Sequence, residues 1–235
     1  MDAIIRIPPQ RLDRSRQAAP QVFEALRELI VAIELPPGTV LPRAELADRY
    51  GVSQTPVRDA LMKLGEEGLV DIYPQHATVV SRIDTTAALQ AHFLRRSLEL
   101  EIVRELAGGD AAMLVLLVPA LREHIASQVR AVAAQDYAAF TLADREFHRQ
   151  MYDAAGMGEL FQLIRQRSGH VDRLRRLNLP AKGKMQAVVR DHKAIVDAIE
   201  ARQPDAAQAA LRKHLAGTLT FVDEVRRRHP EWVSA

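Results

Sequence analysis

The pattern of apolar and polar positions divides the chain into two unlike parts. Near the N-terminus, apolar side chains repeat at helical spacing, at Val22, Leu26, Leu29, Ile30 and Ile33. A Pro-Pro-Gly turn at residues 36–38 ends this first predicted helix. Two further helices are expected within residues 43–66, and two short strands at residues 68–73 and 78–80 complete the segment. This order of elements predicts a helix-turn-helix followed by a small two-stranded wing.

The run of residues 51–62 carries the clearest chemical signal. Gly51 suits a tight backbone bend, and Ser53 is a good N-cap for the next helix. Pro56 lies in the first turn of that helix, where its missing N–H costs little. Three polar residues are expected at the exposed helix start: Gln54, Thr55 and Arg58. A recognition helix presents such residues to a DNA major groove, although a serine and a proline at this spacing also begin ordinary capped helices.

A second part begins after residue 83, where strand-like alternation stops. Three aspartates are placed as N-caps, at positions 84, 110 and 136. Six helices are predicted, at about residues 85–107, 110–134, 136–156, 158–179, 183–202 and 204–229. The sequence thus predicts a mainly α protein with an N-terminal arm over residues 1–19, a winged helix-turn-helix over residues 20–83 and an all-α bundle over residues 84–229.

Composition limits the class of protein without deciding its function. The chain has 235 residues, 48% of them hydrophobic, which is enough for sizeable cores. It has no cysteine, so thiol chemistry is excluded and a reducing compartment is expected. The first 21 residues lack the apolar stretch of a signal peptide. The longest apolar run, residues 111–120, is too short to span a bilayer. We therefore expect a cytoplasmic protein with no membrane partner.

Net charge does not by itself indicate a nucleic-acid partner. Residues 1–80 hold nine Lys and Arg against eleven Asp and Glu, a balance of −2, whereas DNA-binding domains are commonly basic. Placement would have to compensate, with Arg43 and Arg58 facing phosphates and the acidic side chains facing away. The arginine-rich runs at residues 173–176 and 226–228 are interpreted as solvated faces.

The N-terminal pattern resembles the winged-helix domain of the GntR family of bacterial transcriptional regulators over about residues 20–83. The resemblance rests on a Leu-Pro-Pro-Gly turn at residues 35–38 and on Glu-Leu-Ala, Gly-Val-Ser-x-Thr-Pro-Val-Arg and Glu-Gly-Leu-Val within residues 45–70. It implies binding to a double-stranded DNA operator through Arg43, Ser53, Gln54, Thr55, Arg58 and His76. Gln54 stands where the family usually has Arg. Ala77 stands where the wing usually has Gly, after His76 in place of the usual Arg.

Histidines are the chemical signal of the second part. Asp144 and His148 are one turn apart, so they share a helix face. His192 and His214 lie on the fifth and sixth predicted helices. Three imidazoles and a carboxylate that converge inside a bundle bind Zn²⁺, Ni²⁺ or a similar divalent ion. The alternative is that each histidine is an ordinary core or surface residue.

The motifs around these histidines resemble the FCD effector domain of FadR-subfamily GntR regulators. They read Asp144-x-x-Phe-His148, Asp-His192-x-x-Ile and Leu-x-x-His214. The resemblance implies that all four residues bind a metal, and the six-helix count resembles the VanR branch. Family effectors are mostly small organic acids, for which Arg95 is the best non-metal contact. A surface salt bridge with Glu99 is its equal alternative, and His170 is expected to line the effector pocket.

These resemblances together imply a ligand-responsive transcriptional regulator, usually a repressor in the family. A homodimer would place two winged helices on a pseudo-palindromic operator. Two other classes stay open. A metal-dependent hydrolase with an appended winged helix would use the metal to activate water, although no HExxH motif is present. A helical interaction module would use its winged helix to bind protein.

Overall fold

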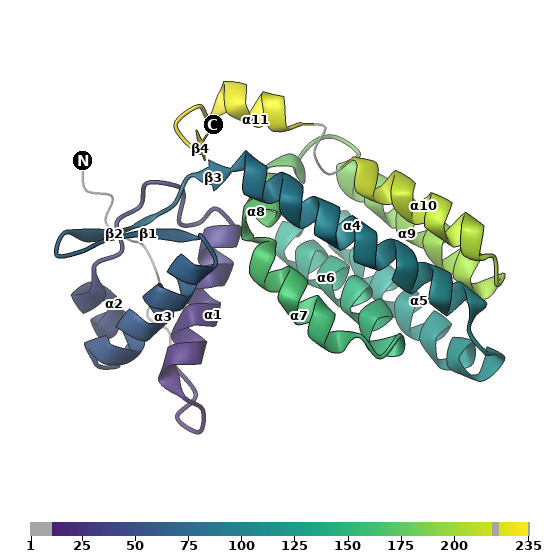
Figure 1. Ribbon diagram of the computed structural model, residues 1–235, viewed down its shortest axis with the longest axis horizontal. Helices are drawn as coiled ribbons and strands as arrows, with labels where there is room; N and C mark the ends of the chain where they lie inside the picture. Colours follow the sequence, from purple (N-terminus) through teal and green to yellow (C-terminus); the bar gives the residue numbers. More distant parts are fainter. Residues whose placement is uncertain (1–10, 218–220, 235) are drawn as a thin grey trace. The chain divides into compact units, whose positions relative to one another are not determined.

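The computed structural model describes residues 11–217 and 221–234, which form two compact units (Figure 1). The first unit combines the chain up to Ala88 with Gly169–Arg176 and the chain from Asp223 onward. The second unit combines Leu89–Ser168 with Leu177–Val222. The first ten residues of the predicted arm lie outside the described part of the chain.

A winged helix-turn-helix forms most of the first unit. Its helices are α1 (Ala18–Val31), α2 (Arg43–Tyr50) and α3 (Gln54–Glu66). Strands β1 (Val70–Tyr73) and β2 (Ala77–Val80) pair antiparallel, with Val70 opposite Val80. The apolar face of α1 is fully buried against α3, as the helical spacing predicts, at Val22, Leu26 and Ile30. The structure confirms the predicted fold of this part.

The turn into α3 has the predicted backbone but not the predicted cap. Gly51 ends α2 with φ +63°, a left-handed conformation that favours glycine. Ser53 occupies the N-cap position of α3 in an extended conformation. Its side chain accepts no capping hydrogen bond, so this detail of the sequence prediction is wrong. Ser53 is exposed at the start of the helix.

Distant segments complete the first unit in a way the sequence patterns do not predict. Strand β3 (Ile83–Asp84) pairs in parallel with β4 (Val233–Ser234), near the end of the chain. Helix α8 (Gly169–Asn178) contributes its first eight residues, and α11 (Val222–Arg228) contributes nearly all of its length. The first unit is therefore built from three stretches of chain.

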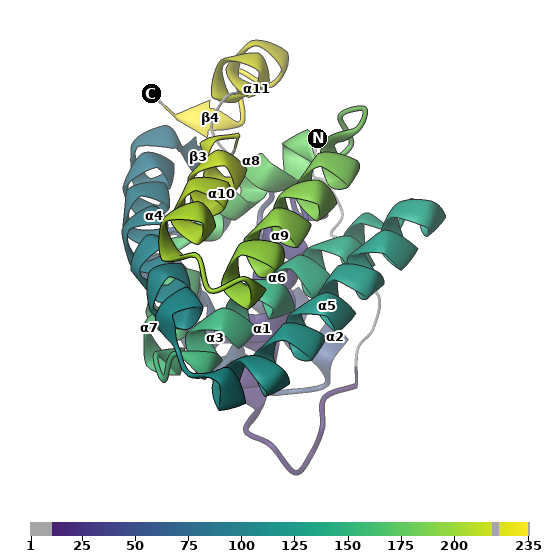
Figure 2. The same ribbon diagram turned by 90° about the vertical axis from the view of Figure 1, so that its right-hand side faces the viewer.

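The second unit is a helical bundle (Figure 2). Its helices are α4 (Thr85–Gly108), α5 (Ala111–Ala134), α6 (Tyr137–Ala154), α7 (Gly158–Arg167), α9 (Lys184–Glu200) and α10 (Pro204–Ala216). Helix α5 packs against α6 and α9, and α9 packs against α10. The predicted caps are present, because the carboxylates of Asp110 and Asp136 accept from the N–H groups of Met113 and Ala139. By length and composition alone, α5 is apolar enough to cross a membrane, but one of its faces lies in this core.

The predicted count of six helices after residue 83 is wrong, because two of the expected helices are each divided. The fourth breaks at Ser168, whose hydroxyl donates to the carbonyl of Ile164 at 2.8 Å. Gly169 follows, and a Cβ there would lie 2.6 Å from Cδ2 of the buried Leu69. The sixth ends at Ala216, and α11 begins at Val222. The described residues therefore hold eight helices from α4 to α11.

A buried ion pair joins α1 to the residue that caps α3. Nε of Arg27 donates to Oε2 of Glu67 at 2.8 Å, and both side chains are less than a tenth exposed. We predict that Glu67→Ala lowers the free energy of unfolding by about 3 kcal/mol, because it leaves a guanidinium buried without its carboxylate. Urea denaturation followed by circular dichroism measures the change.

The control for this prediction is Arg16→Ala, because Arg16 pairs with Glu24 at an exposed position of the same unit. Its expected effect is within about 0.5 kcal/mol. An effect of Glu67→Ala as small as that of the control would contradict the prediction.

Candidate metal centre and nucleic-acid interface

All six residues predicted to contact DNA belong to the first unit and are exposed there. Arg43 begins α2, and His76 lies in the turn of the wing. The other four stand at or near the start of α3: Ser53, Gln54, Thr55 and Arg58. The start of a helix has unpaired N–H groups and a partial positive charge, which suit phosphate. The helix start therefore has the exposure and the donors that a recognition helix needs.

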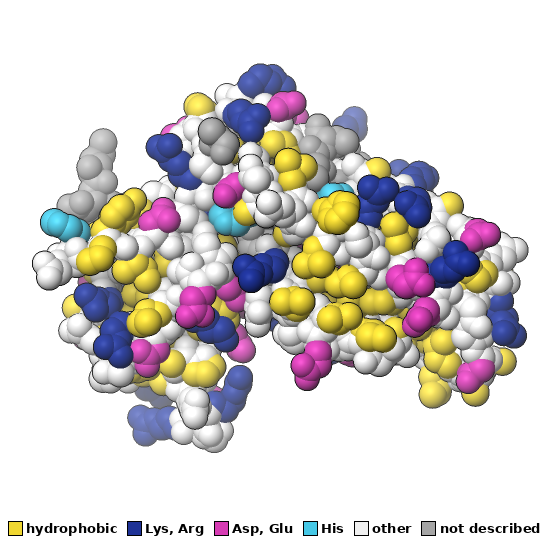
Figure 3. Space-filling view, viewed as in Figure 1, with side chains coloured by type: hydrophobic (Ala, Val, Ile, Leu, Met, Phe, Trp, Pro, Cys, Tyr) yellow, Lys and Arg dark blue, Asp and Glu magenta, His cyan; other side chains and the backbone are white. Residues whose placement is uncertain are grey.

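Acidic side chains stand among these donors. Nη2 of Arg58 lies 3.2 Å from Oδ1 of Asp59, and both side chains are about half exposed. Figure 3 shows basic and acidic side chains interspersed over one face of the molecule. A phosphate that approaches Arg58 would therefore compete with Asp59 for its guanidinium. Acidic side chains such as Asp59 therefore offset the positive charge that the arginines bring to this surface.

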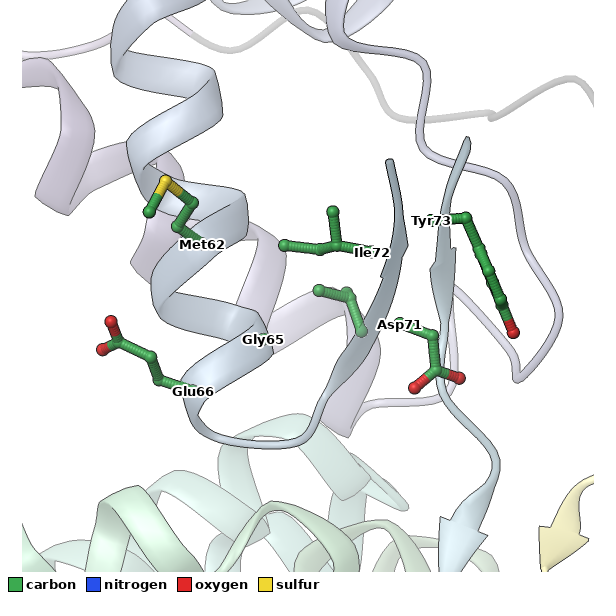
Figure 4. Close-up of a pocket in the computed structure, with 7 residues that line it drawn as sticks. Met62, Gly65, Glu66, Asp71, Ile72 and Tyr73 are labelled. Carbon is green, nitrogen blue, oxygen red and sulfur yellow. The ribbon is translucent and has the colours of Figure 1, made fainter. Parts of the chain in front are cut away.

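A groove of about 520 Å³ lies farther along α3, between that helix and β1 (Figure 4). Ile72 extends from β1 toward α3, and Met62 of α3 also lines the groove. Gly65 leaves room for the side chain of Ile72 in this groove, because a Cβ on residue 65 would lie 3.3 Å from Cδ1 of Ile72. Glu66 and Asp71 also line the groove. Their carboxylates disfavour phosphate, so the basic contacts to DNA are expected at the other end of α3.

Three histidines converge in the second unit, one from each of α6, α9 and α10. Ligand nitrogens of His148, His192 and His214 all lie within 4.8 Å of one another, and each residue is less than a tenth exposed. The Nε2 atoms of His192 and His214 are 3.3 Å apart. Asp144, one turn before His148 on α6, places Oδ1 3.7 Å from Nε2 of His192. The structure thus brings together the four residues that the sequence motifs predict.

The surroundings of the histidines fit a metal ion better than an apolar core. Nδ1 of His192 lies 2.9 Å from Oε1 of Gln128. Because this oxygen is an acceptor, it favours the tautomer with the proton on Nδ1, which leaves the lone pair of Nε2 available to a metal. Burial, together with the neighbouring His192 and His148, holds the pKa of His214 well below its ordinary value. A neutral imidazole is the form that ligates metals. Within the described residues, Nε2 of buried His148 has no hydrogen-bond partner.

Arg95 and Glu99 form a buried ion pair beside this cluster. Nε of Arg95 donates to Oε1 of Glu99 at 2.7 Å, and Oε2 of Glu99 lies 3.2 Å from Nδ1 of His148. Burial alone would raise the pKa of Glu99, but Arg95 and His148 outweigh it and lower that pKa to about 2. The salt-bridge alternative for Arg95 is therefore observed, in the core rather than on the surface. Glu99 connects the guanidinium to the histidine cluster.

His170 lies in the first unit and is not brought to the cluster. Its Nδ1 accepts from the backbone N–H of Asp84 at 3.0 Å and lies 2.8 Å from Nη2 of Arg173. Arg173 has no exposed surface, so the interpretation of its arginine run as a solvated face is wrong at this residue. These contacts occupy Nδ1 of His170 within the first unit.

Two supporting residues of the site have little signal in the sequence. Gln128 is a polar residue on a long apolar helix, and only the fold shows that it faces His192. The pairing of Glu99 with Arg95 can be predicted from their spacing of four residues on one helix. The contact of Glu99 with His148 cannot, because His148 lies on another helix. Such partners orient a ligating imidazole through its second nitrogen, and here they depend on how four helices pack.

Two family models match the chain. A model of the FCD domain matches residues 90–217, and a model of the gntR family of bacterial regulatory proteins matches residues 18–80. An HTH-type transcriptional regulator in an unstable DNA locus of Streptomyces ambofaciens is 33% identical over 89% of this chain and 87% of its own. The HTH-type transcriptional repressor RspR of Escherichia coli (strain K12) is 27% identical over 95% of this chain and 97% of its own.

A solved structure supports the fold. Escherichia coli McbR/YncC superposes with a TM-score of 0.74 and 21% identity, over 89% of this chain and 98% of that one. The curated relatives are named as transcriptional regulators, which favours a regulator over the hydrolase alternative.

The buried neutral His170 predicts a defined loss of stability in acid. Burial and Arg173 lower the pKa of His170 from 6.5 to about 4, against a smaller opposing effect of Asp84. Below pH 6.5 the unfolded chain gains a proton at this residue that the folded chain does not, so stability falls as the pH falls toward about 4. The slope is at most about 1.4 kcal/mol per pH unit.

His170→Gln keeps an acceptor for the Asp84 N–H but cannot be protonated. We expect the variant to lose less stability than the wild type between pH 7 and pH 5, measured by urea denaturation. A difference between the two proteins that does not change with pH would contradict the assignment.

Proposed function

Because the chain belongs to the GntR family of bacterial regulatory proteins and has an FCD domain, we propose that it is a cytoplasmic transcriptional repressor released from DNA by a small organic acid. Residues 20–83 would bind DNA, residues 84–229 would bind the effector and dimerise, and residues 1–19 would form an arm. The observation that carries the proposal is a winged helix in the same chain as a buried cluster of metal-ligating histidines. RspR, a relative along nearly the whole chain, is a repressor.

The proposed operator is a pseudo-palindrome bound by a homodimer. Two copies related by a two-fold axis present two α3 helices, and a symmetric protein selects a symmetric site. The proposed contacts are the exposed polar residues of the first unit: Arg43, Ser53, Gln54, Thr55, Arg58 and His76. Arg58 and Arg43 supply positive charge, and Gln54 is the residue best suited to distinguish one base pair from another.

Asp144, His148, His192 and His214 are the proposed metal ligands, with Zn²⁺ or Ni²⁺ as the ion. Three nitrogens and one oxygen suit either metal. A metal held there would offer a Lewis-acidic position to the carboxylate of an organic acid. Gln128 and Glu99 would orient the rings of His192 and His148 through their Nδ1 atoms.

Arg95 is the proposed second contact of the effector. Its guanidinium is paired with Glu99, which in turn lies beside His148. A carboxylate that binds Arg95 would compete with Glu99, so effector binding would change the electrostatics of a metal ligand. A ligand shifts a conformational equilibrium only through such differences in affinity between two states. The exchange of partners at Arg95 supplies a difference of this kind.

The metal assignment predicts one divalent ion per chain in the purified protein. Elemental analysis of the double variant His192→Ala, His214→Ala is expected to show less than about a tenth of the wild-type metal, because two of four ligands are lost. His124→Ala is the matched control, since His124 lies on α5 of the same unit outside the cluster. Chelation is also expected to lower the melting temperature of the wild type. Stoichiometric metal retained by the double variant would disprove the assignment.

Gln54 predicts an altered operator preference. Arg at this position suits guanine through O6 and N7, whereas Gln pairs with adenine through N6 and N7. We expect one symmetric operator position to prefer an A·T pair, and Gln54→Arg to shift that position toward G·C. Selection from random DNA with both proteins measures the preference.

Arg58→Ala serves as the loss-of-contact control in that selection. It is expected to weaken binding to the selected operator by about 1–3 kcal/mol if the guanidinium contacts a base. Gln54 has an alternative role as a contact to phosphate or water, since half or more of protein–DNA hydrogen bonds go to the backbone. Identical motifs from the wild type and Gln54→Arg would establish that alternative.

A further inference from the structure

A linker of residues 81–85 joins the wing to α4, and its backbone is bonded from three directions. The N–H of Ser81 donates to the carbonyl of Leu69 in the wing at 3.0 Å. The N–H of Ile83 donates to the carbonyl of Trp232 at 2.7 Å. The N–H of Asp84 donates to Nδ1 of His170 at 3.0 Å. The linker lies between the two matched family ranges, which end at residue 80 and begin at residue 90.

Helix α8 holds one side of this linker. Nη1 of Arg173 donates to the carbonyl of Ser81 at 2.7 Å, and Nη2 lies 3.4 Å from the carbonyl of Arg82. The start of α8 packs closely, because a Cβ on Gly68 would lie 3.1 Å from Nε2 of His170. Gly68 also has φ +71°, which disfavours any side chain there. The α8 side of the linker is therefore closely packed and hydrogen-bonded.

The end of the chain holds the other side. We call residues 223–234 the tail. Strand β4 of the tail pairs with β3, with Val233 opposite Ile83. Val233 and Val225 are less than a tenth exposed, so the tail is anchored by burial as well as by pairing. Nη2 of Arg226 lies 3.3 Å from Oγ1 of the buried Thr85, the last linker residue.

These contacts with α8 and the tail keep the linker backbone in one conformation. Five residues without partners would sample many conformations, at an entropic cost for each residue that is ordered. A two-residue strand pair is too short to persist alone, so the buried side chains of the tail are needed to keep β4 in place. The linker is also bonded to the turn that precedes β1, because the hydroxyl of Ser81 donates to the carbonyl of Gly68 at 2.6 Å.

We propose that the tail is a latch on the linker, and that the first unit binds its operator tightly only while the latch is closed. The functional half of this inference rests on the proposed DNA binding, whereas the structural half does not. The whole tail lies beyond residue 217, where the FCD match ends. Opening the latch would free the N–H of Ile83, loosen the Ser81–Gly68 contact and let the wing move relative to α3.

Two variants of the full-length protein open the latch in different ways. Ending the chain after His229 removes β4. Val233→Asp keeps the length but places a carboxylate at a buried position opposite Ile83. Arg227→Ala is the matched control, because Arg227 is an exposed residue of α11. Circular dichroism and melting curves establish that each variant is folded.

Hydrogen exchange followed by mass spectrometry reads the linker directly. We expect the peptide containing Ile83 to exchange at least tenfold faster in both latch variants and at the wild-type rate in Arg227→Ala. Trypsin is expected to cut after the exposed Arg82 at least tenfold faster in the latch variants. Unchanged exchange and cleavage in the latch variants would overturn the proposal.

Operator binding tests the functional half, with DNA that the wild type selects from a random pool. The latch variants are expected to bind that DNA at least fivefold more weakly, and Arg227→Ala as tightly as the wild type. Faster exchange with unchanged DNA affinity would overturn the claim that the latch controls binding. If the wild type selects no DNA, the proposed function fails, while the exchange measurement still decides whether the latch exists.

Discussion

One guanidinium without exposed surface organises the first unit. Arg173 reaches the linker from a helix that lies 92 residues later in the chain than Ser81, and its hydrogen bonds satisfy carbonyls of the linker. Burying this charge lowers the pKa of Arg173 to about 10, because desolvation disfavours the charged form, although Asp71 opposes the shift. Burying such a cation is costly unless its charge is compensated, and here both Nη atoms of Arg173 are hydrogen-bonded. The hydrogen bonds of Arg173 therefore join α8 to the linker that follows the wing.

The second unit meets the same constraint in a different way. Its interior holds three imidazoles, one of which, His214, has a pKa that burial holds well below its ordinary value. It also holds an ion pair in which Arg95 keeps the pKa of the buried Glu99 low. Neutral rings that crowd together gain little from one another, whereas a divalent cation would satisfy all of their lone pairs at once. Glu99 contacts both Arg95 and His148. A change in the position of the Arg95 guanidinium would therefore alter the electrostatic potential at the histidine cluster.

The sequence predicted the features that depend on local chemistry. The bend at Gly51, the caps at Asp110 and Asp136, and the spacing of Asp144 and His148 are each decided within one or two turns of chain. The break at Ser168 was not predicted, because it arises where α8 packs against Leu69. The pairing of β3 with β4 was missed for a similar reason, since two residues hold no periodic pattern. The burial of Arg173 could not be inferred, because an arginine run on a helix usually faces solvent.

Three helices belong to both units, although only the first residue of α11 lies in the second unit. Helix α4 leaves the first unit after Ala88, and α8 leaves it after Arg176. A helix resists bending, because each turn is fixed by its own hydrogen bonds. Arg95 and Glu99 are on α4, whereas Arg173 is on α8. A rearrangement of the buried ion pair would therefore act on a helix whose first turn adjoins the linker. The hydrogen bonds from α8 and the pairing with the tail hold the backbone of that linker within the first unit.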